Sequence, residues 1–144
     1  MIAIASDHGG YALKEILKEH LAAAGIPADD LGCAGEQVDY PDYAASLCRA
    51  VAAGKYDRGI LICGTGIGIS IAANKIHGIR AALCGDCYSA EMARQHNDAN
   101  VLCLGGRVVG SELAKKIVDT FLTTDFSHGE NHIRRIAKIA ALED

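Results

Sequence analysis

The chain alternates short apolar runs with longer segments in which apolar residues recur at helical spacing. The apolar runs predict strands over residues 1–5, 26–31, 59–62, 79–84 and 100–104. The segments between and after them predict helices over residues 11–24, 39–53, 88–95 and 111–122, and a further helix that begins after Gly68 and runs to about residue 75. The pattern is therefore strand followed by helix, repeated five times along the chain.

This alternation predicts an α/β fold. Continuously apolar strands separated by helices are typical of a parallel sheet that is covered on both faces and joined by right-handed crossovers. We therefore expect a Rossmann-like, doubly wound, five-stranded parallel sheet, and 144 residues suit one domain spanning residues 1–144.

A sixth predicted helix, over residues 132–142, has no strand after it. Its apolar positions Ile133, Ile136, Ala137 and Ala140 form one stripe. We expect residues from about 126 to 144 to form a C-terminal arm that packs either on the parent sheet or on a second subunit, and homodimers are the commonest assembly.

Charge and cysteine usage narrow the class of protein. A net charge of −4 argues against a general nucleic-acid surface, although Arg134, Arg135 and Lys138 form a local basic cluster that suits a small anion. Six cysteines without a preceding signal peptide indicate a reducing cytoplasm. The longest apolar stretch, 60–73, is interrupted and shorter than the roughly 18 residues that span a bilayer, so we expect no membrane insertion.

A glycine-rich turn after the third predicted strand is the first candidate site. It contains Cys63, Gly64, Thr65, Gly66 and Gly68. Glycines let backbone N–H groups approach a ligand, and the start of a helix favours negative charge. The same donors favour the thiolate of a cysteine, so the turn offers a base and an anion site at the mouth of one pocket. It matches neither a P-loop nor a dinucleotide fingerprint, and the spacing alone equally allows a glycine turn with an inert, buried cysteine.

Other polar residues follow the same kind of strand end. Asp7 and His8 follow the first strand and Arg107 follows the fifth, so topology brings them towards Cys63 at the carboxyl edge of the sheet. His96 is different, because it ends a helix and precedes the fifth strand. Within one chain it is expected at the opposite edge, so it reaches Cys63 only from a partner chain or through an unusual helix end.

Several motifs in order along the chain closely resemble those of type B ribose-5-phosphate isomerases. They are Asp-His-Gly-Gly (7–10), Asp-Tyr-Pro (39–41), Ile-Cys-Gly-Thr-Gly-Ile-Gly-Ile-Ser (62–70), Ala-Ala-Asn-Lys (72–75), Gly-Ile-Arg-Ala (78–81), Arg-Gln-His-Asn-Asp (94–98) and Gly-Arg-Val-Val-Gly (106–110). The family also includes allose-6-phosphate and galactose-6-phosphate isomerases, so the resemblance fixes the reaction better than the sugar.

The resemblance implies interconversion of ribose 5-phosphate and ribulose 5-phosphate through an enediolate, in the pentose phosphate pathway of carbohydrate metabolism. It implies no metal or other cofactor, and a homodimer with sites between subunits; whether dimers pair further stays open. Cys63 would be the base, and His96 of a second subunit would open the sugar ring. The enediolate would be stabilised by the Thr65 hydroxyl and by the turn that contains Gly64, Gly66, Gly68 and Ser70.

The resemblance also implies how the rest of the substrate is held. Asn97 would bind a sugar hydroxyl, and Asp7, Asp39 and Tyr40 would form polar walls. The phosphate would be bound by His8, Arg107, His132 and Arg135, some of them across the subunit interface, because guanidinium groups bind phosphate in a bidentate manner.

One segment departs from the family pattern. Members of the family usually have Gly-Gly-Arg-His where this chain has Gly129, Glu130, Asn131 and His132. The arginine that the family pattern provides for binding phosphate is therefore missing. We hypothesise that this chain has a weaker affinity for phosphate or an altered substrate, such as a hexose 6-phosphate.

Two other functional classes compete with an isomerase. They are a non-catalytic sugar-phosphate receptor, which has no need for Cys63 together with His96, and a cysteine hydrolase, which forms a covalent intermediate. Cys84 and Cys87 have redox spacing, but their place after the fourth strand argues against a thioredoxin-like role.

Overall fold

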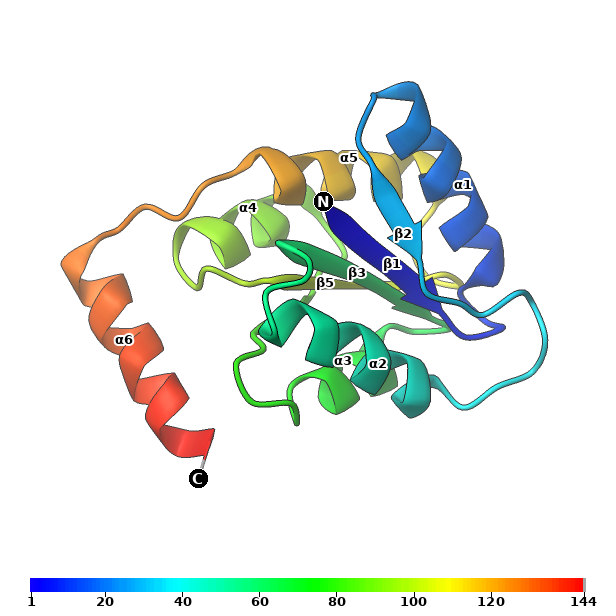
Figure 1. Ribbon diagram of the computed structural model, residues 1–144. Coiled ribbons are helices and arrows are strands. Elements are labelled where there is room, and N and C mark those ends of the chain that lie inside the picture. The colour runs from blue at the N-terminus through cyan, green and yellow to red at the C-terminus, as the bar shows by residue number, and fades with distance from the viewer. Residues whose placement is uncertain (144) are drawn as a thin grey trace.

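The computed structural model describes residues 1–143 and contains a five-stranded sheet in which every paired strand is parallel (Figure 1). The strands are β1 (Ile2–Ser6), β2 (Ala28–Asp30), β3 (Arg58–Cys63), β4 (Ala81–Leu83) and β5 (Val101–Gly105). Their spatial order is β2-β1-β3-β5-β4, so the strand order reverses between β1 and β3. The predicted fold class is confirmed.

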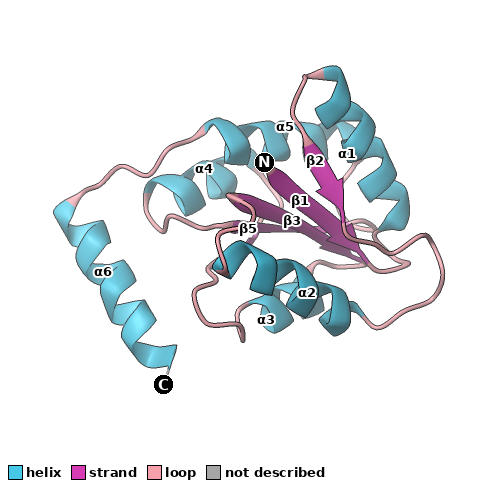
Figure 2. Cartoon of the chain, in the orientation of Figure 1, coloured by secondary structure: helices cyan, strands magenta, loops and turns pink. Residues whose placement is uncertain are grey.

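Helices follow the strands as the apolar spacing predicts (Figure 2). They are α1 (Tyr11–Ala23), α2 (Tyr40–Ala52), α3 (Ile67–Ala73), α4 (Cys87–Gln95), α5 (Ser111–Thr123) and α6 (Glu130–Ala140), the last extended by the 3-10 turn η1 (Ala141–Glu143). Among these helices, none combines the length and the apolar character that a bilayer crossing requires.

The fourth strand is shorter than predicted, and a side chain explains the difference. Residues 79–84 were expected to be extended, but β4 covers only Ala81–Leu83. The Arg80 amide donates to the Asn100 side chain at 2.9 Å and not to a strand carbonyl, although the Arg80 carbonyl still accepts from the Val101 amide at 3.4 Å. An apolar run does not reveal this kind of bond.

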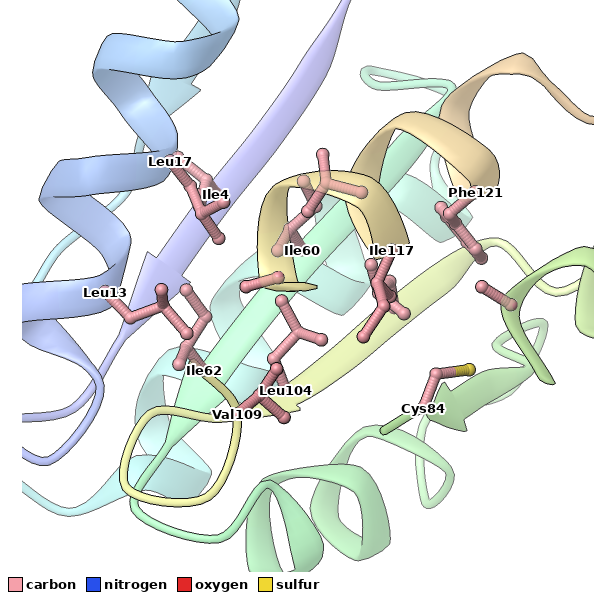
Figure 3. Close-up of a cluster of buried hydrophobic side chains, with 14 of the residues drawn as sticks. Ile4, Leu13, Leu17, Ile60, Ile62, Cys84, Leu104, Val109, Ile117 and Phe121 are labelled. Carbon is pink, nitrogen blue, oxygen red and sulfur yellow. The ribbon is translucent and has the colours of Figure 1, made fainter. Parts of the chain in front are cut away.

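The two faces of the sheet are covered by different helices. Ile4, Ile60, Ile62 and Leu104 point to the face covered by α1, α4 and α5, where they pack with Phe121 (Figure 3). The alternate residues of the same strands point to the face covered by α2 and α3. Cys63 belongs to this second layer, so the pleat of β3 aims its thiol towards α3.

Helix α6 lies away from the sheet, after an extended linker (Figure 1). None of its residues is buried, and Ile133 and Ile139 are 49% and 45% exposed. In this chain the arm therefore does not cover the parent sheet, which leaves its apolar stripe open.

Candidate active site

Three loops meet at the carboxyl edge of the sheet, where β1, β3 and β5 end. The Gly106 amide donates to the Cys63 carbonyl at 2.8 Å, and the Arg107 amide donates to the Gly64 carbonyl at 2.9 Å. A Cβ added at Gly9 would lie 3.1 Å from the Gly64 nitrogen, and one added at Gly106 would lie 2.8 Å from the Gly9 carbonyl oxygen. The residues predicted to converge from the three strands therefore do lie together.

The Cys63 thiol lies deeper than the sequence led us to expect. The residue is only 4% exposed, because its side chain enters the layer between the sheet and α3 instead of projecting from the mouth of a pocket. The Gly66 amide donates to the sulfur at 3.1 Å. Gly66 has a φ of 78°, a left-handed conformation that glycine adopts without strain and that directs the chain from this turn into α3.

The start of α3 supplies fewer free amides than its glycine content suggests. The Ile67 amide donates to the Thr65 hydroxyl at 3.2 Å, and the Ser70 amide donates to the Gly66 carbonyl at 3.2 Å. The Ser70 hydroxyl donates to the Ile67 carbonyl, so it stabilises the helix itself. Within residues 1–143, the amides of Gly68 and Ile69 have no hydrogen-bond acceptor.

The β1 and β2 loops form one wall of this edge. The Asp7 carboxylate accepts from the Gly10 amide at 3.1 Å, and the His8 Nδ1 accepts from the Val38 amide at 3.3 Å. A Cβ at Gly68 would lie 2.5 Å from the Tyr40 hydroxyl oxygen, so the Tyr40 ring lies against the start of α3.

Asp39 and Arg107 are two exposed charged residues of this edge. Asp39 precedes α2, and its carboxylate makes no capping bond to the helix. A Cβ added at Gly64 would lie 3.1 Å from Nη1 of Arg107, so the guanidinium lies beside the turn that holds Cys63. An exposed guanidinium next to backbone donors is suited to a phosphate.

A second cluster forms at the opposite, amino-terminal edge. The rings of His96 and His132 are stacked, with centroids 4.2 Å apart and planes 10° apart. Partial burial lowers the pKa of His132 below its usual 6.5, and the charges of His96 and Arg135 lower it further. Asn97 is exposed beside His96, and Asn131 and Arg135 are exposed on α6.

One chain therefore carries two separate groups of site residues. Cys63 follows β3, whereas the turn that contains His96 precedes β5; the Gly59 amide at the start of β3 donates to the carbonyl of Asn100, next to that turn, at 2.9 Å. The length of β3 separates the two groups, so the chain does not bring its own His96 to its own Cys63.

Three charged residues around His96 had no role assigned from the sequence. Arg94 and Asp98 form an ion pair at 2.8 Å, and the Arg80 guanidinium donates to the Asp98 carbonyl at 2.9 Å. The spacing of Arg94 and Asp98, four residues apart, is the signal that could have indicated the pair.

The other cysteines differ from Cys63 in their surroundings. Burial raises the pKa of Cys48 to about 12 and that of Cys84 to about 11, and the nearby Asp86 adds to the effect on Cys84. Burial also raises the pKa of Cys103. These three thiols stay protonated near neutral pH, whereas Cys63 lies at the end of a strand beside a backbone donor. The fold is that of an α/β protein with an open parallel sheet, a class in which small molecules bind at the topological switch point.

Comparison with known proteins narrows this class to one family. The family model described as Ribose/Galactose Isomerase matches residues 2–139. Ribose-5-phosphate isomerase B of Escherichia coli (strain K12) is 52% identical over 143 residues, which are 99% of this chain and 95% of that protein. D-erythrulose-4-phosphate isomerase of Pectobacterium atrosepticum is 47% identical over 130 residues, 89% of this chain and 86% of that protein.

A solved structure gives the same result. Ribose-5-phosphate isomerase B of Clostridium thermocellum superimposes with a TM-score of 0.96 at 53% identity, covering 99% of this chain and 96% of that one. This chain belongs to the ribose/galactose isomerase family, so the resemblance seen in its motifs is confirmed.

The meeting of the three loops predicts the effect of a small substitution. Gly106→Ala should destabilise the protein by about 1–3 kcal/mol, because the added methyl group would press on backbone atoms of Gly9 and Gly10, which cannot rotate away. Urea unfolding measures the change. Gly110→Ala is the control, since a Cβ at Gly110 meets nothing within 4 Å; equal stability of both variants would contradict the packing described.

Proposed function

We propose that this protein interconverts ribose 5-phosphate and ribulose 5-phosphate, with Cys63 as the base. The observation that carries the proposal is the carboxyl edge of the sheet, where a thiol and two unpaired amides on the turn after β3 lie beside an arginine on the loop after β5. The relatives from Escherichia coli and Clostridium thermocellum are ribose-5-phosphate isomerases at 52% and 53% identity over 99% of this chain. A receptor has no need for the buried thiol.

Proton transfer is the first task of the proposed site. The Cys63 thiolate takes the proton from C2 of the open-chain aldose, and the electrons of the C–H bond form the C1–C2 double bond as the carbonyl oxygen becomes negative. The proton of the 2-hydroxyl moves to O1, and the thiol then returns a proton to C1, which leaves a carbonyl at C2. The Gly66 N–H, 3.1 Å from the sulfur, stabilises the thiolate before the first transfer and after the second.

Stabilisation of the enediolate is the second task. The unpaired amides of Gly68 and Ile69 and the Thr65 hydroxyl lie at the same turn as Cys63. Each donor of this kind contributes about 2.7–4 kcal/mol in comparable oxyanion holes. The Tyr40 ring, which lies against Gly68, and the Asp7 loop narrow this space around the sugar.

Phosphate binding uses groups from both edges. Arg107 and His8 lie at the edge that holds Cys63, and we assign His132 and Arg135 of a second subunit to the same phosphate. A phosphate dianion beside His132 offsets the effect of its cationic neighbours and favours the protonated imidazole.

We also propose that two subunits share each site. His96, the proposed acid and base for ring opening, lies at the wrong edge to serve its own Cys63, and a two-fold axis would bring it to the partner's edge together with Asn97. Exposed apolar side chains support this assembly: Ile67 and Ile71 on α3 are 53% and 58% exposed, and the stripe of α6 is also open. The C-terminal arm, residues 126–144, would then pack on the partner.

We place the protein in a reducing cytoplasm, which its six free cysteines support.

The first prediction tests the reaction and its base. Purified protein should convert ribose 5-phosphate to ribulose 5-phosphate, with solvent deuterium entering C1 of the ketose. Cys63→Ser should lower kcat by about 10²–10⁴-fold, because a serine hydroxyl is far less acidic than a thiol. Cys87→Ser, at a half-buried position outside the site, is the control. An inactive wild-type protein would contradict the function, and an active Cys63→Ser variant would contradict the base.

The second prediction tests phosphate binding by α6. Asn131 is exposed one residue before His132 and four before Arg135, which places the three on one side of the helix. Asn131→Arg should lower the KM for ribose 5-phosphate by about tenfold, because a hydrogen bond to a charged group contributes about 1.5–3 kcal/mol. Asn131→Gln lengthens the side chain without adding charge and should leave KM unchanged. A KM that does not respond to arginine would show that α6 does not reach the phosphate.

A further inference from the structure

The turn that carries His96 has an unusual backbone. Helix α4 ends at Gln95, and the chain reverses over five residues to enter β5 at Val101. Asp98 has a φ of 45°, in the left-handed region that aspartate and asparagine tolerate better than most residues. Its amide donates to the Arg94 carbonyl at 3.2 Å, and the Ala99 amide donates to the Ala93 carbonyl at 3.0 Å. These two hydrogen bonds hold the turn against the end of α4.

A buried arginine fixes the inner side of this turn. Arg94 is only 5% exposed, and its Nη1 donates to the Asp98 carboxylate at 2.8 Å and to the Ala99 carbonyl at 2.6 Å. Its Nε donates to the Thr124 carbonyl at 3.0 Å. A buried guanidinium is retained at low cost only when its donors are paired, and these three bonds use three of its five N–H donors.

A second arginine fixes the outer side. Arg80 comes from the segment before β4, and its Nε donates to the Asn97 carbonyl at 3.0 Å. Its Nη2 donates to the Asp98 carbonyl at 2.9 Å. Asp98 therefore lies between two guanidinium groups, one bound mainly to its side chain and the other to its carbonyl.

The same arrangement fixes the position of α6 relative to His96. Thr124, which accepts from Arg94, is the first residue after α5, and the Ser127 amide donates to the Gln95 carbonyl at 3.1 Å. These bonds hold the beginning of the linker against the end of α4. His132 then stacks on His96 with ring centroids 4.2 Å apart.

We propose that Arg94 and Asp98 are positioning residues that hold the imidazole of His96 in place beside His132. The inference rests on the proposed function for the role of His96, but the position itself can be measured without any activity. Arg94 acts through the turn, because a side chain this deeply buried leaves no surface for a substrate. Displacement of a catalytic group by about 1 Å costs roughly 10²-fold in rate. Loss of the Arg94–Asp98 ion pair is therefore expected to lower kcat.

The test compares four variants by two readouts. Arg94→Met and Asp98→Ala remove the ion pair, whereas Asp98→Asn keeps an oxygen acceptor and tolerates the left-handed backbone. Arg58→Met is the matched control, because Arg58 also lies over the Phe121 ring and donates to the Phe121 carbonyl, but within residues 1–143 it donates no hydrogen bond to the turn. The readouts are the nuclear Overhauser effect between the His96 and His132 ring protons, and kcat with ribose 5-phosphate.

We expect the Overhauser contact to disappear in Arg94→Met and Asp98→Ala, with kcat lower by about 10²-fold, and both readouts to be retained in Asp98→Asn and Arg58→Met. If Arg94→Met does not fold, the two Asp98 variants decide the question alone. A contact that persists in Asp98→Ala, or that is lost equally in Arg58→Met, would overturn the proposal. A wild-type protein that shows the contact but does not isomerise the sugar would overturn the proposed function and leave the positioning intact.

Discussion

The close approach of three backbone loops at the carboxyl edge of the sheet is the constraint on which the site depends. The bond from the Gly106 amide to the Cys63 carbonyl ties the end of β3 to the loop after β5, and Gly9 fits between them because it has no side chain. This contact sets where the thiol lies relative to Arg107. It also explains why glycines occupy positions where any Cβ would press on backbone atoms.

The depth of Cys63 changes the view of its chemistry. A thiol that is 4% exposed is protected from bulk water, and the Gly66 N–H is its recorded hydrogen-bond donor. In such surroundings a single oriented dipole has more influence on a charge than it has in water. The proposed base therefore depends on the turn that holds the Gly66 N–H 3.1 Å from the sulfur.

Hydrophobic pattern and topology were sufficient to predict the fold and the meeting of the loops at one edge of the sheet. Continuous apolar runs indicated buried parallel strands, and strand ends indicated that Asp7, Cys63 and Arg107 would meet. The sequence also indicated that His96 lies at the other edge, because it precedes a strand instead of following one.

Other features depend on bonds between side chains and distant backbone groups, which periodicity does not reveal. Lys14 lies on the apolar face of α1 and is fully buried, because its amine is bound by Asp30 and by the Cys33 carbonyl. The bond from Arg94 to Thr124 spans 30 positions in the chain. The use of the Gly66 and Ile67 amides within the turn likewise appears only in three dimensions.

The central claim is that one chain's thiol works with another chain's imidazole, and subunit mixing tests it most directly. Cys63→Ser and His96→Ala proteins, each inactive alone, would be unfolded together, refolded and assayed with ribose 5-phosphate. The mixture should recover roughly a quarter of wild-type activity, because about half of the dimers are mixed and each mixed dimer carries one intact site. A mixture as inactive as its two components would contradict the shared site.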